Sequence, residues 1–189
     1  MSETIKFKMT GVCPLLLHNG QLANPMYFYT KEIKKVSGKR NKTDADHEHM
    51  AKLEFLGSLY TKEDGTLILP SDIWEGTLIN GAKKNRLGQQ AKAGLFVSNE
   101  PVLIYKGAKK PEKLWEDKNF VHQVPVKIQR NTIIRTRPIL KDWNCEVHVN
   151  YNETILNKET IIEIANIAGE QVGVGDWRPK YGRFSVKVI

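Results

Sequence analysis

The chain ends in NKETIIEIANIAGEQVGVGDWRPKYGRFSVKVI (residues 157–189), the stretch that says most about the fold. Its apolar spacing predicts a helix over residues 157–169 and a closing strand over residues 185–189. Between them lies a loop, residues 172–184, in which three positions are glycine: Gly173, Gly175 and Gly182. Because glycine has no Cβ, these positions allow positive φ angles and a close approach of the backbone to a ligand.

The same loop combines cations with flat rings. Arg178, Lys180 and Arg183 carry the charges, and Trp177 and Tyr181 stand between them in the sequence. Such a surface suits a polyanion with stackable bases, because cations attract phosphates and bases stack on aromatic rings. The alternative is a helix-to-strand connection in which the glycines only turn the chain and the aromatic rings close the core. The spacing alone leaves both interpretations open.

The loop resembles the C-terminal glycine-rich loop of the repeat-associated mysterious protein (RAMP) superfamily, the ferredoxin-like RNA-binding proteins of CRISPR systems. Members typically end in a helix, a G-x-G-like turn and an aromatic-Gly-Arg-aromatic entry into the last strand. The matching positions here are residues 161–169, 173–175 and 181–184. A second match, LPSDIWEGTLINGAK at residues 69–83, is similar to a helix start of the subunits that form CRISPR effector backbones. It departs from the family pattern at residues 71–72 and Glu75, where members usually have Gly-Ser-Ser and Lys.

This resemblance implies an α+β, ferredoxin-like (RRM-like) βαββαβ sheet with its helices on one face. It implies a single domain over residues 1–189, with insertions near residues 24–60 and 106–119. It also implies RNA as the ligand and side-by-side packing of subunits, as in the backbone of CRISPR effectors. The whole chain is similar as well to a group of uncharacterised phage and prophage proteins, which would suit single-stranded DNA equally.

Residue patterns in the rest of the chain predict elements in the same order. Alternating apolar residues predict a strand over residues 5–13, and Thr43 is placed to cap a helix over residues 43–59. Apolar residues at helical spacing predict another helix over residues 72–86. Two long strands, at residues 124–140 and 145–151, are predicted to pair as a hairpin.

Two polar stretches are predicted to lie outside the core. Residues 31–42 hold six cations and one acid, with Gly38 in the middle, and this pattern is typical of a mobile loop. Residues 106–119 are predicted to be a polar insertion that contributes little to the core. Residues 24–42, which include the first stretch, and residues 106–119 are expected to reach a neighbouring subunit or to insert between bases.

The composition is typical of a globular protein with an excess of positive charge. Of 189 residues, 40% are hydrophobic and 26% are charged, and the formal net charge is +8. This charge favours a polyanion such as nucleic acid as the partner. No apolar run approaches the ~20 residues of a membrane span, and no secretory signal is visible, so a cytoplasmic location is expected, the host cytoplasm if the chain is phage-encoded. Cys13 and Cys145 are expected to be buried, reduced thiols.

The basic residues form four clusters, at residues 31–42, 83–92, 127–137 and 178–183. Arg135 and Arg137 are two apart and would share a strand face, and a cationic strand beside the cationic loop would follow a phosphate backbone. The alternative is a solvated sheet edge whose charges prevent aggregation. The candidate nucleic-acid-binding residues are Lys83, Lys84, Arg86, Lys127, Arg130, Arg135, Arg137, Gly173, Gly175, Trp177, Arg178, Lys180, Tyr181 and Arg183.

His18 follows the first predicted strand, where RAMP-fold RNA-processing endonucleases often have a histidine as general base. That resemblance implies a rival function, metal-independent cleavage of RNA with His18 as the base. Residues 44–49, DADHEH, contain possible metal ligands. In a helix, however, His47 and His49 would point ~200° apart and could not share one ion. No catalytic residue, metal or cofactor is therefore assigned.

Together these features predict a non-enzymatic protein that binds single-stranded RNA or DNA and assembles side by side into a homo-oligomer or filament. Binding is expected to be independent of sequence, because contacts to phosphates carry little information about the bases. The rival predictions are the His18 endoribonuclease and a phage structural or anti-defence protein whose partner is another protein.

Overall fold

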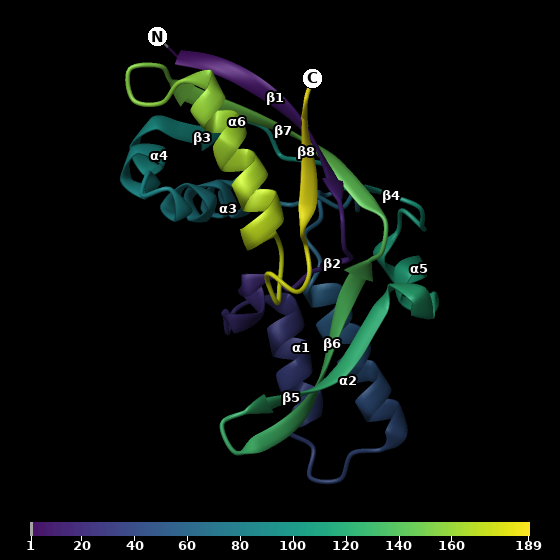
Figure 1. Ribbon diagram of the computed structural model, residues 1–189. Coiled ribbons are helices and arrows are strands. Elements are labelled where there is room, and N and C mark those ends of the chain that lie inside the picture. The colour runs from purple at the N-terminus through teal and green to yellow at the C-terminus, as the bar shows by residue number, and fades with distance from the viewer. Residues whose placement is uncertain (1) are drawn as a thin grey trace. The chain divides into compact units, whose positions relative to one another are not determined.

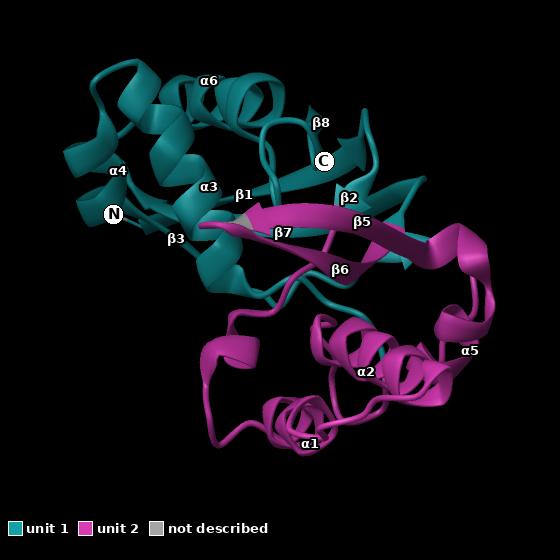
Figure 2. Ribbon diagram, turned by 90° about the horizontal axis from the view of Figure 1, so that it is seen from below, with its two compact units in different colours: residues 1–15, 66–106, 140–189 teal, residues 16–65, 107–139 magenta. Residues whose placement is uncertain are grey.

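The computed structural model describes residues 2–189, with Ile128 described by its backbone alone. Its backbone contacts divide the chain into two units, each built from segments far apart in the sequence (Figure 2). Unit 1 comprises residues 1–15, 66–106 and 140–189, and unit 2 comprises residues 16–65 and 107–139. Apart from Lys106, both predicted insertions fall within unit 2. The single domain over the whole chain stays a prediction.

Unit 1 contains an antiparallel sheet in the order β3-β7-β1-β8, with β4 also paired to β7 (Figure 1). The strands are β1 (Ser2–Gly11), β3 (Leu95–Val97), β4 (Ile104–Tyr105), β7 (Trp143–Asn152) and β8 (Phe184–Val188). The two predicted terminal strands are present and pair with each other, because β1 and β8 are antiparallel neighbours with Met9 opposite Val186. The predicted α+β class is confirmed as well.

One face of this sheet is buried under helices. Along β1, Ile5, Phe7 and Met9 are buried, whereas the residues between them are exposed, as strand geometry requires. The helices of the unit are α3 (Ser71–Lys84), α4 (Gly88–Gly94) and α6 (Lys158–Ile167), which continues into a π-helical turn, η3 (Ala168–Val172). Helix α3 contributes Trp74, whose ring lies 5.3 Å from that of Phe184 on β8. Figures 1 and 2 show α3 and α6 on the same side of the sheet.

Unit 2 combines helices with a β-hairpin. The helical elements are η1 (Gly20–Ala23), α1 (Phe28–Ser37), α2 (Asp44–Gly57), α5 (Pro111–Glu116) and η2 (Lys118–Phe120). Strands β5 (Val121–Ile128) and β6 (Asn131–Leu140) pair with each other, and β6 also pairs with β2 (Leu15–Leu16). The Thr43 cap is confirmed: its hydroxyl accepts the Asp46 N–H, and the Asp46 carboxylate accepts the Thr43 N–H.

The predicted long hairpin of residues 124–140 and 145–151 is wrong. Residues 124–140 instead contain most of the β5–β6 hairpin, with a two-residue turn at Gln129 and Arg130, and Gln129 has a φ of 54°. The preferred two-residue turns contain glycine or asparagine, so this turn gives no recognisable signal in the sequence. Strand β7, which covers residues 145–151, pairs with β1, β3 and β4.

Two predictions about polar stretches are also wrong. Much of the predicted loop at residues 31–42 belongs to α1, which is anchored by Val36, buried at 8% exposure. The stretch 106–119 includes α5, in which Leu114 and Trp115 are buried. The ring of Trp115 lies 5.4 Å from that of Phe55 on α2, so this insertion forms part of the core of unit 2. Isolated apolar residues among many lysines gave too weak a periodicity to be recognised.

Both cysteines are free thiols. Cys145 is buried as predicted, and its burial raises the pKa of the thiol, whereas Cys13 is only half-buried. Among the described residues, no helix is both long and apolar enough to cross a membrane.

Candidate nucleic-acid interface

The candidate site in unit 1 begins where α3 meets the end of α6. Gly81 is buried there, and a Cβ at this position would lie only 2.8 Å from both the Ala168 Cβ and the Ile164 carbonyl oxygen. Only glycine permits this approach without displacing one of the helices. The contact therefore brings the last turn of α3 beside the π-helical turn η3.

Helix α3 presents polar residues along this side. Thr77, Asn80 and Lys84 follow the helical i, i+3, i+7 spacing, so they lie on one face. Lys83 donates a hydrogen bond from Nζ to Asn80 Oδ1 at 3.0 Å, which fixes its ammonium group near the helix. Lysines in the last turn of a helix also interact favourably with its dipole, by about 0.3–1 kcal/mol each.

The glycine-rich loop is held by backbone hydrogen bonds. Gly173 N–H donates to the Ala168 carbonyl at 2.8 Å, and Val174 N–H donates to the Gly182 carbonyl at 2.9 Å. The φ angles of 74°, 81° and 73° show that all three loop glycines adopt the positive φ that the sequence allows. At Gly182 a Cβ would lie 1.7 Å from the Val174 carbonyl oxygen, so this glycine is required by the loop itself. These hydrogen bonds and the close approach at Gly182 stabilise one conformation of the loop.

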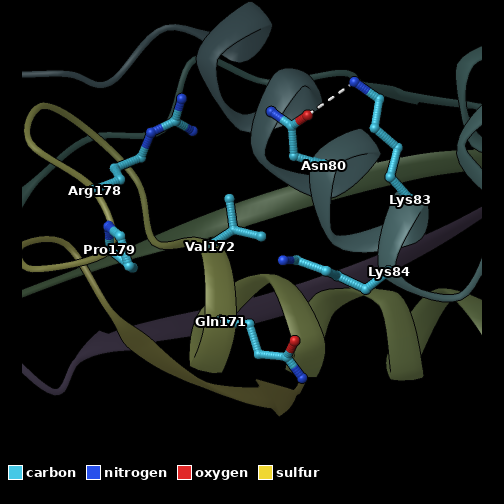
Figure 3. Close-up of a pocket in the computed structure, with 7 residues that line it drawn as sticks. All are labelled: Asn80, Lys83, Lys84, Gln171, Val172, Arg178 and Pro179. Carbon is cyan, nitrogen blue, oxygen red and sulfur yellow. Dashed lines mark hydrogen bonds between the residues drawn. The ribbon is translucent and has the colours of Figure 1, made fainter.

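The loop, η3 and α3 line an open pocket of about 450 Å³. Arg178 comes from the loop and Lys83 and Lys84 come from α3, so the pocket joins two of the basic clusters seen in the sequence. Figure 3 shows Arg178 on the loop facing α3, with the Lys84 side chain directed toward Val172. Arg178 Nη1 lies 3.4 Å from the hydroxyl of Thr77. The remaining lining residues are Asn80, Gln171, Val172 and Pro179.

A second basic pocket, of about 530 Å³, adjoins α3 on the side of α4. Lys83, Arg86 and Lys92 line it, and Lys83 lines both pockets. The Lys83 side chain packs on Gly88, where a Cβ would lie 2.6 Å from Lys83 Cγ. None of the described residues that line the two pockets is acidic. These two pockets of unit 1 therefore form a cationic surface without a carboxylate among their described lining residues.

The aromatic residues of the loop pack around a lysine. Lys180 Nζ lies 4.9 Å from the ring centroid of Trp177 and 5.6 Å from that of Tyr181, both within the range of a cation–π contact. The Trp177 side chain is 44% exposed. Arg183 is exposed and donates from Nε to the Pro179 carbonyl at 3.0 Å. Trp177 thus has a partly exposed ring next to the Lys180 ammonium group, and its role in binding stays a prediction.

The basic residues of the hairpin belong to unit 2. Lys127 and Arg130 are exposed at and near its turn, and Arg137 is half-buried. Arg135 forms an ion pair with Glu54 of α2, with 2.8 Å between Nη1 and Oε1. The sequence suggested that Arg135 and Arg137 form one phosphate track with the loop, but the hairpin and the loop lie in different units. A role for either group in binding stays a prediction.

His18 also lies in unit 2 and is half-buried. Its Nδ1 is 3.5 Å from the hydroxyl of Ser58, and its carbonyl accepts a hydrogen bond from the Tyr60 hydroxyl. These contacts hold the ring and the backbone of His18 in place. The role of His18 as a general base stays a prediction. Within residues 2–189, no group of three or more His, Cys, Asp or Glu side chains is arranged to hold a metal ion.

Sequence reasoning missed part of the lining of the first pocket. Asn80 could have been found, because it lies one helical turn before Lys83 and Lys84 on the predicted helix. Gln171 and Val172 were not predicted to line a pocket, because they belong to a π-helical turn, which has no recognisable sequence pattern.

Comparisons with known proteins found a structural likeness only. No family model matches the chain, and no curated protein sequence matches it. A chain in the cryo-EM structure of the type III-B Cmr-beta bound to cognate target RNA is similar in fold, with a TM-score of 0.52 at 12% sequence identity. The match covers 100% of this chain and 61% of that chain, so the present chain spans about three-fifths of its length. At this identity, the likeness shows the fold alone.

Proposed function

We propose that this protein binds single-stranded nucleic acid, with RNA as the favoured ligand, through the basic surface of unit 1. The observation that carries this proposal is the pocket in which Lys83 and Lys84 of α3 meet Arg178 of the glycine-rich loop. Three cations around one concave site attract phosphates, and the amide groups of Asn80 and Gln171 add hydrogen-bonding partners. The neighbouring pocket with Arg86 and Lys92 extends this surface along α3.

Three features support RNA and a relationship to the RAMP superfamily. The antiparallel order β3-β7-β1-β8, with α3 and α6 on one face, supports a ferredoxin-like sheet. The structural neighbour is part of a CRISPR assembly bound to its target RNA. The exposed Trp177 ring beside Lys180 would stack on a base, a contact that suits an unpaired strand. Single-stranded DNA is the alternative ligand.

We further propose that binding is non-enzymatic, is largely independent of sequence and is accompanied by side-by-side assembly of copies. Contacts to phosphates position a strand without identifying its bases, which agrees with a surface built from lysines and arginines. Incubation with labelled RNA in EDTA should leave the RNA intact. Cleavage that is lost in His18→Ala would replace this proposal by the endoribonuclease.

The test compares two triple variants of equal charge change. Lys83→Ala, Lys84→Ala and Arg178→Ala together remove three cations from the pocket. The control removes Lys6, Lys8 and Lys187, which are exposed on the other face of the sheet in β1 and β8. Fluorescence anisotropy with a long unstructured RNA, repeated over a series of salt concentrations, measures both variants.

Each neutralised phosphate contributes ~0.7 to the slope of log K against log salt for a single strand. The pocket variant should therefore flatten this slope by about two, while the control keeps the slope of the unmodified protein. Equal losses in the two variants would mean that only net charge matters and would refute the pocket. An unchanged slope in the folded pocket variant would refute it as well.

A further inference from the structure

Unit 2 contains a pocket of about 590 Å³ that the proposed function does not use. It lies between helix α2, one residue of α1 and the β5–β6 hairpin. On α2 the lining residues recur at positions 47, 50, 51 and 54, which is one face of a helix. A volume of several hundred Å³ is typical of sites for small molecules.

Two sides of this pocket are apolar. Helix α2 contributes Met50 and Ala51, and strand β6 contributes Ile133 and Ile134. The Ile134 side chain is 56% exposed, although it is large and apolar. Apolar surfaces on opposite elements, both accessible, suit the two faces of a flat ring, and the thioether of Met50 packs favourably on aromatic rings.

The charges inside the pocket balance each other. Arg135 is paired with Glu54, and the second carboxylate oxygen of Glu54 accepts the Thr136 N–H at 2.9 Å. Glu54 is 9% exposed, so its carboxylate is held inside the protein by these two contacts. Besides Arg135, the only basic side chain among the described residues that line the pocket is His47. The pocket therefore lacks the cluster of lysines and arginines that lines the pockets of unit 1.

Polar groups nevertheless lie along its edge. Arg135 uses Nη1 for Glu54, and its guanidinium carries further N–H donors. Gln123 donates from Nε2 to the Thr136 hydroxyl at 3.2 Å, which leaves its amide oxygen as an acceptor. A purely aliphatic occupant would cover these groups without satisfying them, at a cost of about 1–3 kcal/mol each. A heteroaromatic ring satisfies both demands, because its faces are apolar and its edge carries donors and acceptors.

We propose that this pocket of unit 2 binds a single nucleobase. Its faces contact Met50 and Ile134, and its edge hydrogen-bonds to Arg135 and Gln123. The base belongs either to a free nucleoside or nucleotide or to an unstacked position of a single strand. The proposal stands on this pocket alone and does not require unit 1 to bind a strand.

The test fills the pocket and leaves the rest of the helix unchanged. Ala51→Phe places a ring in the pocket, whereas Ala45→Phe makes the same change at an exposed position of α2 that does not line the pocket. The probe is the ribonucleoside of 2-aminopurine, whose fluorescence reports its environment. The unmodified protein and Ala45→Phe should bind it equally, and Ala51→Phe should bind it at least about tenfold more weakly.

Thermal unfolding shows whether Ala51→Phe is folded. A second variant tests the pocket independently of that result. Ile134→Ala removes an exposed side chain from the pocket, so the fold should be retained while affinity for the probe falls several-fold. Equal binding by all variants, or no binding of the probe by the unmodified protein, would overturn the proposal.

A single-stranded RNA with one 2-aminopurine distinguishes the two sources of the base. If strand bases enter the pocket, its fluorescence change should be sensitive to Ala51→Phe. If only free nucleosides enter, the strand should be insensitive and the nucleoside sensitive. The triple variant at Lys83, Lys84 and Arg178 should retain the nucleoside response in either case. Loss of strand binding in that variant and loss of the nucleoside response in Ala51→Phe are therefore separate results.

Discussion

Two arginines show how differently the two units use the same side chain. Arg178 of unit 1 lies at an open pocket with Lys83 and Lys84, and the contact to Thr77 involves a neutral hydroxyl. Arg135 of unit 2 lies in a pocket where Glu54 balances its charge. In the sequence, both belong to clusters of basic residues and are equivalent candidates. The comparison shows that the group beside an arginine, a carboxylate or a neutral hydroxyl, decides whether its charge is available for a phosphate. The number of basic residues near it in the sequence does not.

The largest expected effect concerns the core of unit 2. Trp115→Ala removes a ring that is 8% exposed and packs on Phe55 of α2. Truncation of a buried tryptophan typically costs about 3–5 kcal/mol, so the thermal unfolding temperature should fall clearly. If the unfolding temperature of Trp115→Ala equals that of the unmodified protein within error, α5 contributes little to the core. This result would also break the assignment of α5 to the core of unit 2.

The packing that forms the basic pocket of unit 1 should be the next most sensitive. Gly81→Ala forces a Cβ against Ala168 and should cost about 1–3 kcal/mol, with weaker RNA binding because α3 moves away from η3. Gly76→Ala is the matched control on the same helix, since nothing lies within 4 Å of its Cβ. That control should stabilise the protein by about 0.5–1 kcal/mol. Chemical denaturation of both variants measures the contrast.

The balanced charge of unit 2 is tested by Glu54→Gln. This change keeps the shape of the side chain but leaves Arg135 without its carboxylate, at an expected cost of about 1–3 kcal/mol. Glu48→Gln, an exposed position of α2, should leave stability within about 0.5 kcal/mol of the unmodified protein. If Glu54→Gln and Glu48→Gln have equal free energies of unfolding in denaturant titrations, the ion pair between Glu54 and Arg135 does not stabilise unit 2. It would then not be a difference between the two units.

The smallest expected effect lies at the start of α2, the helix that carries most of the pocket of unit 2. Thr43→Ala should cost about 1 kcal/mol of unfolding free energy, because it removes the hydroxyl that accepts the Asp46 N–H.

The hydrogen bond from Lys39, together with those from Thr43, lowers the pKa of Asp46 from 3.8 to about 2. The folded state thus holds this carboxylate charged at a pH at which the unfolded chain has already bound a proton.

The stabilisation from Asp46 is therefore complete above pH 4 and declines as the pH falls from about 4 to about 2. Thermal unfolding over this range should show a smaller loss in Asp46→Asn than in the unmodified protein, because asparagine does not titrate. Identical pH profiles would mean that Asp46 is not held in its charged form.

Local features of the sequence were sufficient for part of this structure. The loop glycines adopt positive φ because only glycine does so readily, and Thr43 caps α2 because its hydroxyl reaches an N–H three residues on. The alternation of apolar residues predicted β1, and the apolar pattern at the C-terminus predicted β8. The two strands pair in one sheet. Each of these features depends on steric or hydrogen-bonding rules that act within a few residues. Such rules can be applied without knowing the rest of the fold.

The tertiary structure alone decided which charges meet. Lys83 and Arg178 are far apart in the sequence, and they share a pocket because Gly81 lets α3 approach η3 closely. Arg135 is paired because the hairpin places it beside Glu54 of α2. Charge and hydrogen bonding depend on distance in space, and chain closure over many residues sets that distance. The sequence by itself therefore determined where cations are abundant, and the fold determined which of them line an open pocket and which already have a carboxylate.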